Sequence, residues 1–125
     1  ARWWSELNPG KTALAPSAEP EDFAKEVSGE VVFIKHTYDA FNCSNCTPAL
    51  LAHLRASGVR RLYIAGALTK ACVMFTCNSA FTLGFEVCVV GDCCGDRSRE
   101  HHDAVLKTYD GYHLRVVDSS SLAFD

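Results

Sequence analysis

The sequence contains no basic cluster and no uninterrupted apolar run long enough to cross a membrane. The net charge of its 125 residues is −3, and no group of positive charges exceeds the pair of arginines at 60–61. Nucleic-acid binding usually shows as a basic face, so we expect no nucleic-acid partner. The nearest approach to a membrane span, at 71–90, is interrupted by Asn78 and Glu86 and divided by Gly84. No membrane partner is expected either.

The chain also lacks the apolar stretch of a secretory leader, since it begins ARWWSELNPG. Cysteine, in contrast, is abundant: there are seven, and the odd number leaves at least one thiol unpaired in a monomer. These features predict free thiols in a reducing, cytoplasmic environment. A composition of 48% hydrophobic and 22% charged residues is typical of one folded domain with a single core.

Apolar runs alternate with helix-like segments along the chain. The runs predict strands at 30–35, 61–66, 85–92 and 113–118. Capping residues and apolar periodicity predict helices at 19–27, 47–58, 70–84 and 98–112, with Thr47 as the N-cap of the second. The fold class is therefore α/β, with right-handed βαβ units and a parallel sheet. Ligands bind such sheets outside the carboxyl ends of the strands, which makes residues just after each strand candidates for function.

Cys72 follows the second predicted strand, in the first turn of the next helix, where Thr69 is the expected N-cap. Backbone N–H groups at a helix start favour a thiolate, so this position suits a reactive cysteine. Buried, unreactive cysteine is the commoner case and stays the alternative. Cys77 lies more than one turn further into an apolar helix, and we expect it to fill the core.

Lys35 ends the first apolar run and so faces the same edge of the predicted sheet. Its ammonium could hold a thiolate by charge or orient a substrate carbonyl. A lysine that simply reaches solvent from a strand end is the alternative.

Three further features are weaker candidates. Cys43 and Cys46 form a C-x-x-C, which suits a redox pair or half of a zinc site. A zinc site needs two further ligands; Cys93 and Cys94 could offer one, but adjacent cysteines rarely chelate one ion together. The neighbouring histidines at 101–102 have no partner at ligand spacing and indicate a solvated helix face. Asp92, at the end of the third predicted strand, is expected to cap the loop that follows it, with contact to the site as the alternative.

Taken in order, these residues resemble the isochorismatase-like cysteine hydrolases, a family that includes nicotinamidases and related amidases. The likeness rests on K-x-x-x-x-A-F from Lys35, a Leu-rich helix, G-x-x-T-x-x-C-V from Gly66 and VVGDCC at 89–94. It covers nearly the whole chain. The resemblance implies one hydrolase domain over 1–125, incomplete at its N-terminus. Its fold would be a three-layer α/β/α parallel sheet of Rossmann-like type, here lacking the first two strands.

The resemblance also implies roles in an Asp–Lys–Cys triad. Cys72 would be the nucleophile, and Lys35 would stabilise its thiolate. Backbone N–H groups of Leu68 and Cys72 would form the oxyanion hole, beside a cis peptide between Ala67 and Leu68. Such a site hydrolyses the C–N bond of a small carboxamide through a thioester, with no cofactor.

Two residues near Lys35 are candidates for lining the substrate pocket, namely Tyr38 and Phe41. Phe41 is equally suited to the core.

The family's aspartate is not found in this sequence. It lies at the end of an apolar strand near the N-terminus of the family's domain, and no such strand precedes Lys35. The carboxylates that do precede it fall in predicted loops or in the first helix: Glu6, Glu19, Glu21, Asp22, Glu26 and Glu30. No metal site is predicted, because the metal ligands of some nicotinamidases belong to the same missing part.

An incomplete sheet leaves apolar edges uncovered. We therefore expect the missing portion to exist as a further segment, a separate cleaved chain or a swapped partner, and the protein to associate as a homo-oligomer or with that portion. Three functions stay open. The first is an amidase acting on a small molecule, and the second is a non-catalytic member with a binding or structural role. The third is a redox or metal protein using Cys43 and Cys46.

Overall fold

The computed structural model describes residues 22–123, which fall into two separately described units, one ending at Val32 and one beginning at Phe33. The first unit contains a short 3₁₀ helix, η1 (Asp22–Ala24), and a turn in which the Glu30 N–H donates to the Val27 carbonyl at 3.1 Å. The helix predicted over 19–27 is therefore wrong beyond residue 24, and its residues 19–21 lie outside the described part.

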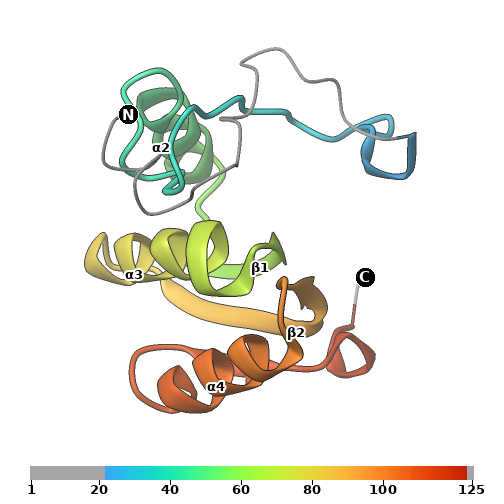
Figure 1. The fold of residues 1–125 in the computed structure, drawn as a ribbon. Coiled ribbons are helices and arrows are strands. Elements are labelled where there is room, and N and C mark those ends of the chain that lie inside the picture. The colour runs from blue at the N-terminus through green and yellow to red at the C-terminus, as the bar shows by residue number, and fades with distance from the viewer. Residues whose placement is uncertain (1–21, 124–125) are drawn as a thin grey trace, which may run out of the picture. The chain divides into compact units, whose positions relative to one another are not determined.

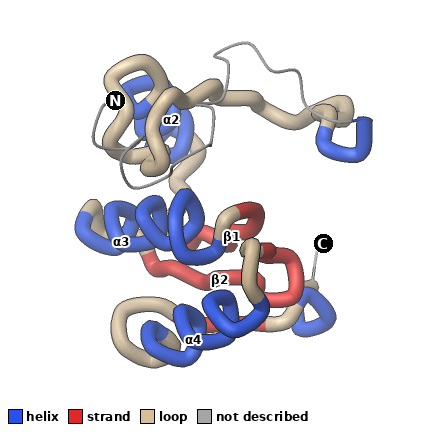
Figure 2. Tube along the Cα trace, in the orientation of Figure 1, coloured by secondary structure: helices blue, strands red, loops and turns tan. Residues whose placement is uncertain are grey.

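Three parallel strands form the sheet of the second unit: β1 (Arg61–Ala67), β2 (Glu86–Gly95) and β3 (Arg115–Val117). They lie side by side in the order of the sequence, with helices between them (Figure 2). The parallel α/β fold is thus confirmed, and three of the four predicted strands are found close to their predicted positions.

The helices of this unit are α2 (Thr47–Ala56), α3 (Met74–Thr82) and α4 (Arg99–Tyr109). A single π-helical turn, η2 (Thr69–Val73), leads into α3, and a 3₁₀ turn, η3 (Ser119–Ser121), follows β3. No helix of the described residues is both long and apolar enough to cross a membrane.

Two of the predicted N-caps are wrong. The residue at the N-cap of α2 is Cys46, because the Thr47 hydroxyl instead accepts from the Cys43 N–H at 2.8 Å and donates to the Ala40 carbonyl at 2.9 Å. Leu68 is the N-cap of η2, since the Thr69 side chain turns into the core. In both places a longer-range hydrogen bond replaces the local cap.

Helices α3 and α4 cover the same face of the sheet (Figure 1). Successive right-handed crossovers between strands in sequential order place both helices on one side. The apolar core between them comprises Val73, Met74, Cys77, Ala80, Phe85, Val87, Val89, Leu106 and Leu114. This packing fixes η2, and with it Cys72, against the carboxyl end of β1.

The strand predicted at 30–35 does not form. Val31 and Ile34 are 58% and 67% exposed, and the segment has extended or irregular backbone without ladder hydrogen bonds. An apolar run becomes a strand only when a neighbour satisfies its N–H and C=O groups, and no strand of the described residues pairs with it. The run therefore has the composition of a buried strand without the partner it needs.

Candidate active site

The turn that carries Cys72 begins two residues after the end of β1. Cys72 is half-buried and lies in the middle of η2. The Leu68 carbonyl accepts from the N–H groups of Ala71 at 3.0 Å and Val73 at 3.3 Å, which closes the turn around the cysteine. Cys72 therefore lies at the carboxyl edge of the sheet, where ligands bind in this class of fold.

Leu68 is the second notable residue of this turn. The peptide between Ala67 and Leu68 is cis, as the family resemblance implied. Leu68 is the N-cap of η2, so its N–H lies at the start of the turn that carries Cys72. A backbone donor beside a nucleophile is what an oxyanion hole requires.

Cys77 differs from Cys72 in its burial. It is completely buried between α3 and β2, and burial raises the pKa of its thiol to about 12. The nearby Cys94 adds to this rise. The predicted packing role of Cys77 is confirmed.

Lys35 does not contact Cys72 among the described residues. Its Nζ donates to the Thr37 carbonyl at 2.8 Å, so the side chain closes a local turn. Its charge acts on Cys46, where it lowers the thiol pKa against the larger effect of burial, which raises it. The structure thus brings Lys35 near the C-x-x-C and does not bring it to the predicted nucleophile.

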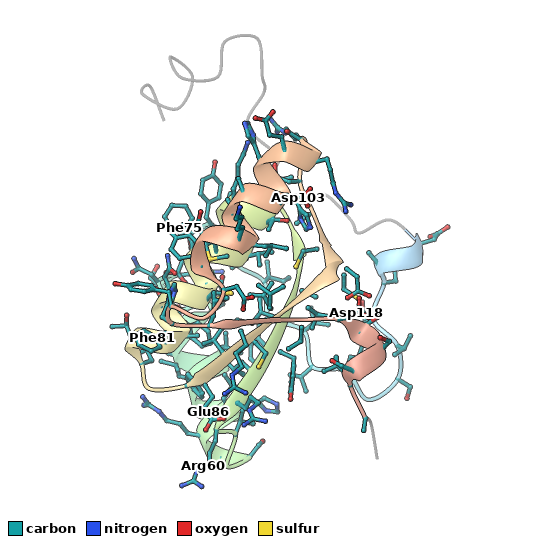
Figure 3. All side chains as sticks on the ribbon, turned by 90° about the horizontal axis from the view of Figure 1, so that it is seen from below. Arg60, Phe75, Phe81, Glu86, Asp103 and Asp118 are labelled. Carbon is teal, nitrogen blue, oxygen red and sulfur yellow. The ribbon has the colours of Figure 1, made fainter. Side chains whose placement is uncertain are left out.

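The two candidate pocket residues occupy different environments. The ring of Phe41 stacks on Phe85 at 5.8 Å and packs against the core, which favours the core alternative for this residue. Tyr38 is 48% exposed, and its ring lies 5.9 Å from that of Phe75. Phe75, labelled in Figure 3, is an exposed residue of α3. Tyr38 is therefore partly exposed beside α3.

Two histidines of α4 contact the turn that carries Cys72. His102 is buried, and its Nδ1 lies 2.8 Å from the hydroxyl of Thr69. His101 is exposed, and its Nδ1 lies 2.6 Å from Lys70 Nζ. The predicted solvated face is correct for His101 and wrong for His102. Helical periodicity offered a signal, because His102 is four residues before the buried Leu106 and so shares its face.

Asp96 also holds this turn, although no pattern in the sequence points to it. Its side chain is fully buried, and one carboxylate oxygen accepts from the Lys70 N–H at 2.9 Å. The other oxygen lies 3.6 Å from Lys70 Nζ and accepts from the Arg97 N–H at 2.7 Å. Burial alone would raise the pKa of Asp96, but these donors and the Lys70 charge lower it overall.

Asp92 does not cap the loop that follows it: it lies within β2, and its carboxylate is engaged structurally with Ser119, 27 residues later. It accepts from the backbone N–H of Ser119 at 2.8 Å and from the Ser119 hydroxyl, which lowers the pKa of the carboxyl. The contact ties the middle of β2 to η3. No group of three or more potential metal ligands occurs among residues 22–123.

A hollow of about 690 Å³ runs along the sheet. Arg61, Glu86 and Arg115, the first residues of the three strands, line it, and so do Val117 at the end of β3 and Leu122 beyond it. Cys72 does not line this hollow, so it is not the candidate site.

The Isochorismatase domain family matches residues 3–121 of this chain. The chain belongs to the isochorismatase family. Maleamate amidohydrolase from Pseudomonas putida is 34% identical over 90 residues, which are 72% of this chain and 40% of that protein. The chain thus spans less than half of this curated relative.

Solved structures agree with this assignment. A hydrolase of the isochorismatase family from Chromobacterium violaceum is 32% identical, with a TM-score of 0.69 over 80% of this chain and 55% of its own. An isochorismatase family protein from Desulfovibrio vulgaris is 27% identical, with a TM-score of 0.74 over 94% of this chain and 61% of its own. A nicotinamidase/pyrazinamidase from Bacillus subtilis is 25% identical, with a TM-score of 0.60 over 67% and 44%.

Proposed function

We propose that this chain carries the nucleophile of an amidase-type hydrolase that cleaves the C–N bond of a small carboxamide. The observation that carries the proposal is the position of Cys72, half-buried in a closed turn directly after β1. Membership in a hydrolase family and similarity to an amidohydrolase and to nicotinamidases support it.

In the proposed reaction, the Cys72 thiolate attacks the carbonyl carbon of the amide. The tetrahedral oxyanion that forms accepts hydrogen bonds from the N–H groups of Leu68 and Cys72. Collapse expels ammonia or an amine and leaves a thioester, which water hydrolyses to the carboxylic acid. Each donor of such an oxyanion hole is typically worth about 3 kcal/mol in the transition state.

Lys35 is proposed as the cation that stabilises the thiolate, and Tyr38 as a residue that lines the pocket. The support for Lys35 is its place in the K-x-x-x-x-A-F motif. Its hydrogen bond to the Thr37 carbonyl is exposed, so releasing the ammonium requires only one weak contact to break. The aspartate of the triad is proposed to come from the part of the family's domain that this chain does not match.

A second candidate is a binding or structural role without catalysis. Four of the carboxylates that follow Lys35 are engaged elsewhere: Asp39 with Ser79, Glu86 with Arg61, Asp92 with Ser119 and Asp96 with Lys70. None of them contacts Cys72 among the described residues. Without a base, the thiol would have no acceptor for its proton.

Ammonia release from maleamate and from nicotinamide tests the proposal, in a preparation whose chains are all identified by intact mass and N-terminal sequencing. We expect hydrolysis that Cys72→Ala abolishes and that Cys93→Ala, a control at an exposed thiol, leaves unchanged. Hydrolysis that survives Cys72→Ala would overturn the mechanism. A preparation that contains the family's aspartate but hydrolyses no amide would favour the binding role.

A further inference from the structure

Cys43 and Cys46 occupy one helical turn immediately before α2. The Cys43 carbonyl accepts from the N–H of Cys46 at 3.2 Å and from the N–H of Thr47 at 2.9 Å. Residues three apart on such a turn point to the same side, with Cβ atoms about 5–6 Å apart. Disulfides need about 3.5–4.5 Å, so a small adjustment of the turn suffices to join the two sulfurs.

The two thiols already interact with each other and differ in character. The N–H of His36 donates to the Cys43 sulfur at 3.4 Å and is the main reason that the pKa of Cys43 falls to about 7. Burial raises the pKa of Cys46, and its contact with Cys43 raises it further. One thiol is thus half ionised at neutral pH while its neighbour keeps its proton.

This pair is shallow, unlike the core thiol Cys77. Both cysteines are only 3% exposed, but the groups that cover Cys43 are themselves at the surface. The exposed Asn45 side chain contacts the Cys43 sulfur and donates to the Ile34 carbonyl at 2.7 Å. A surface side chain therefore forms part of the cover over the Cys43 sulfur, whereas Cys77 lies between a helix and a strand.

From this geometry we propose that Cys43 and Cys46 form a second reactive site, separate from Cys72, that exchanges with small-molecule disulfides and closes to an intramolecular disulfide. The proposal does not depend on amide hydrolysis. It assigns a function to the one sequence motif that the hydrolase leaves unused.

The exchange balances with the small disulfide as oxidant. The Cys43 thiolate attacks one sulfur of the disulfide, forms a mixed disulfide and expels the first thiolate. Cys46 then loses its proton and attacks the Cys43 sulfur, which expels the second thiolate. Two protein thiols are oxidised, and one disulfide is reduced to two small thiols.

The surrounding contacts allow closure without loss of the fold. The Cys46 thiol donates to the Ala40 carbonyl at 3.6 Å, and closure removes this weak bond. The Thr47 hydroxyl donates to the same carbonyl at 2.9 Å and is unaffected. The Ala40 N–H stays bonded to Thr76 on α3 at 3.1 Å, so the turn remains attached to the helix that carries the core.

Equilibration of the folded protein in graded ratios of oxidised to reduced glutathione tests the proposal. Free thiols are then alkylated and mapped by mass spectrometry. We expect a disulfide between Cys43 and Cys46 to appear as the ratio rises, and Cys93→Ser to leave it unchanged. Two free, separately alkylated thiols in fully oxidised glutathione would overturn the proposal, as would a stoichiometric zinc ion held by the pair.

Single variants separate the two steps. Cys46→Ser is expected to accumulate a stable mixed disulfide at Cys43, because no second thiol resolves it. Cys43→Ser is expected to react at least roughly fivefold more slowly than Cys46→Ser. The larger thiolate fraction of Cys43 outweighs its lower intrinsic nucleophilicity. Equal rates for the two variants would contradict the assigned order. Circular dichroism shows whether both variants are folded, so that their reaction rates can be compared.

Discussion

Thr69 and His102 are 33 residues apart in the sequence, and their side chains meet at 2.8 Å in the core. Both are buried, Thr69 completely and His102 to 8% exposure. The bond joins the first turn of α4 to the turn that carries Cys72. A buried hydroxyl needs a hydrogen-bond partner, so the bond to His102 fixes the position of Thr69 and of η2, which contains it.

His102→Ala should therefore lower the free energy of unfolding by about 1–3 kcal/mol, because it leaves the Thr69 hydroxyl buried without a partner. Urea unfolding measures the loss. The adjacent His101→Ala is the matched control, since His101 is exposed, and we expect about 0.5 kcal/mol or less. Thr69→Val combined with His102→Ala should cost less than the sum of the two single changes. Additive losses would show that the hydrogen bond contributes nothing.

The sequence was sufficient for the parallel α/β fold because apolar runs are local signals. It predicted the packing role of Cys77 for the same reason, whereas the loop cap predicted at Asp92 gave way to a contact with Ser119, 27 residues later. The family motifs selected Cys72, and the structure places it after β1.

Other features depended on contacts between distant residues. The apolar run at 30–35 needed a neighbouring strand, and Thr69 needed a histidine from another helix before its side chain could turn inward. Asp96 follows β2 in the sequence, but it caps η2, the turn that precedes β2. Short-range patterns contain no information about such pairings, which is why these residues were missed or misplaced.

Gly91 lies where β2 passes closest to its neighbours. A Cβ at this position would lie 3.1 Å from Val116 and 3.3 Å from Leu106. Gly91→Ala should thus destabilise the protein by about 1–3 kcal/mol through overpacking, measured by urea unfolding. Gly95→Ala at the end of the same strand is the control, because nothing lies within 4 Å of its Cβ position. Equal stabilities of the two variants would mean that β2 can move away from β3 and α4.

The stability of the protein should fall at alkaline pH through Cys77. Burial raises its pKa from 9.0 to about 12, so the folded state favours the neutral thiol. This contribution is present below pH 9.0 and is lost as the pH rises toward about 12, with a slope of up to about 1.4 kcal/mol per pH unit. Comparison of the wild type with Cys77→Ala isolates the effect from other groups. A difference in unfolding free energy that does not change with pH would contradict it.

The buried Asp96 should give the opposite pH dependence. Its pKa is lowered below 3.8 in the folded state, where the Lys70 N–H and the Lys70 ammonium favour the carboxylate. The stabilisation is therefore present above pH 3.8 and is lost as the pH falls below that value. Asp96→Ala should cost about 0.5–2 kcal/mol at neutral pH, as for other residues that cap a helix start.

Asp96→Asn separates the two components of this effect. The amide oxygen still accepts from the Lys70 N–H, so part of the stability remains, but the charge is lost. The difference in unfolding free energy between wild type and Asp96→Asn should then shrink as the pH falls, whereas Asp103→Asn, in an exposed pair with Arg99, should have little effect at any pH. A difference that persists in acid would mean that Asp96 acts through its shape and hydrogen bonds alone. In that case the negative charge beneath the Cys72 turn would contribute nothing to its stability.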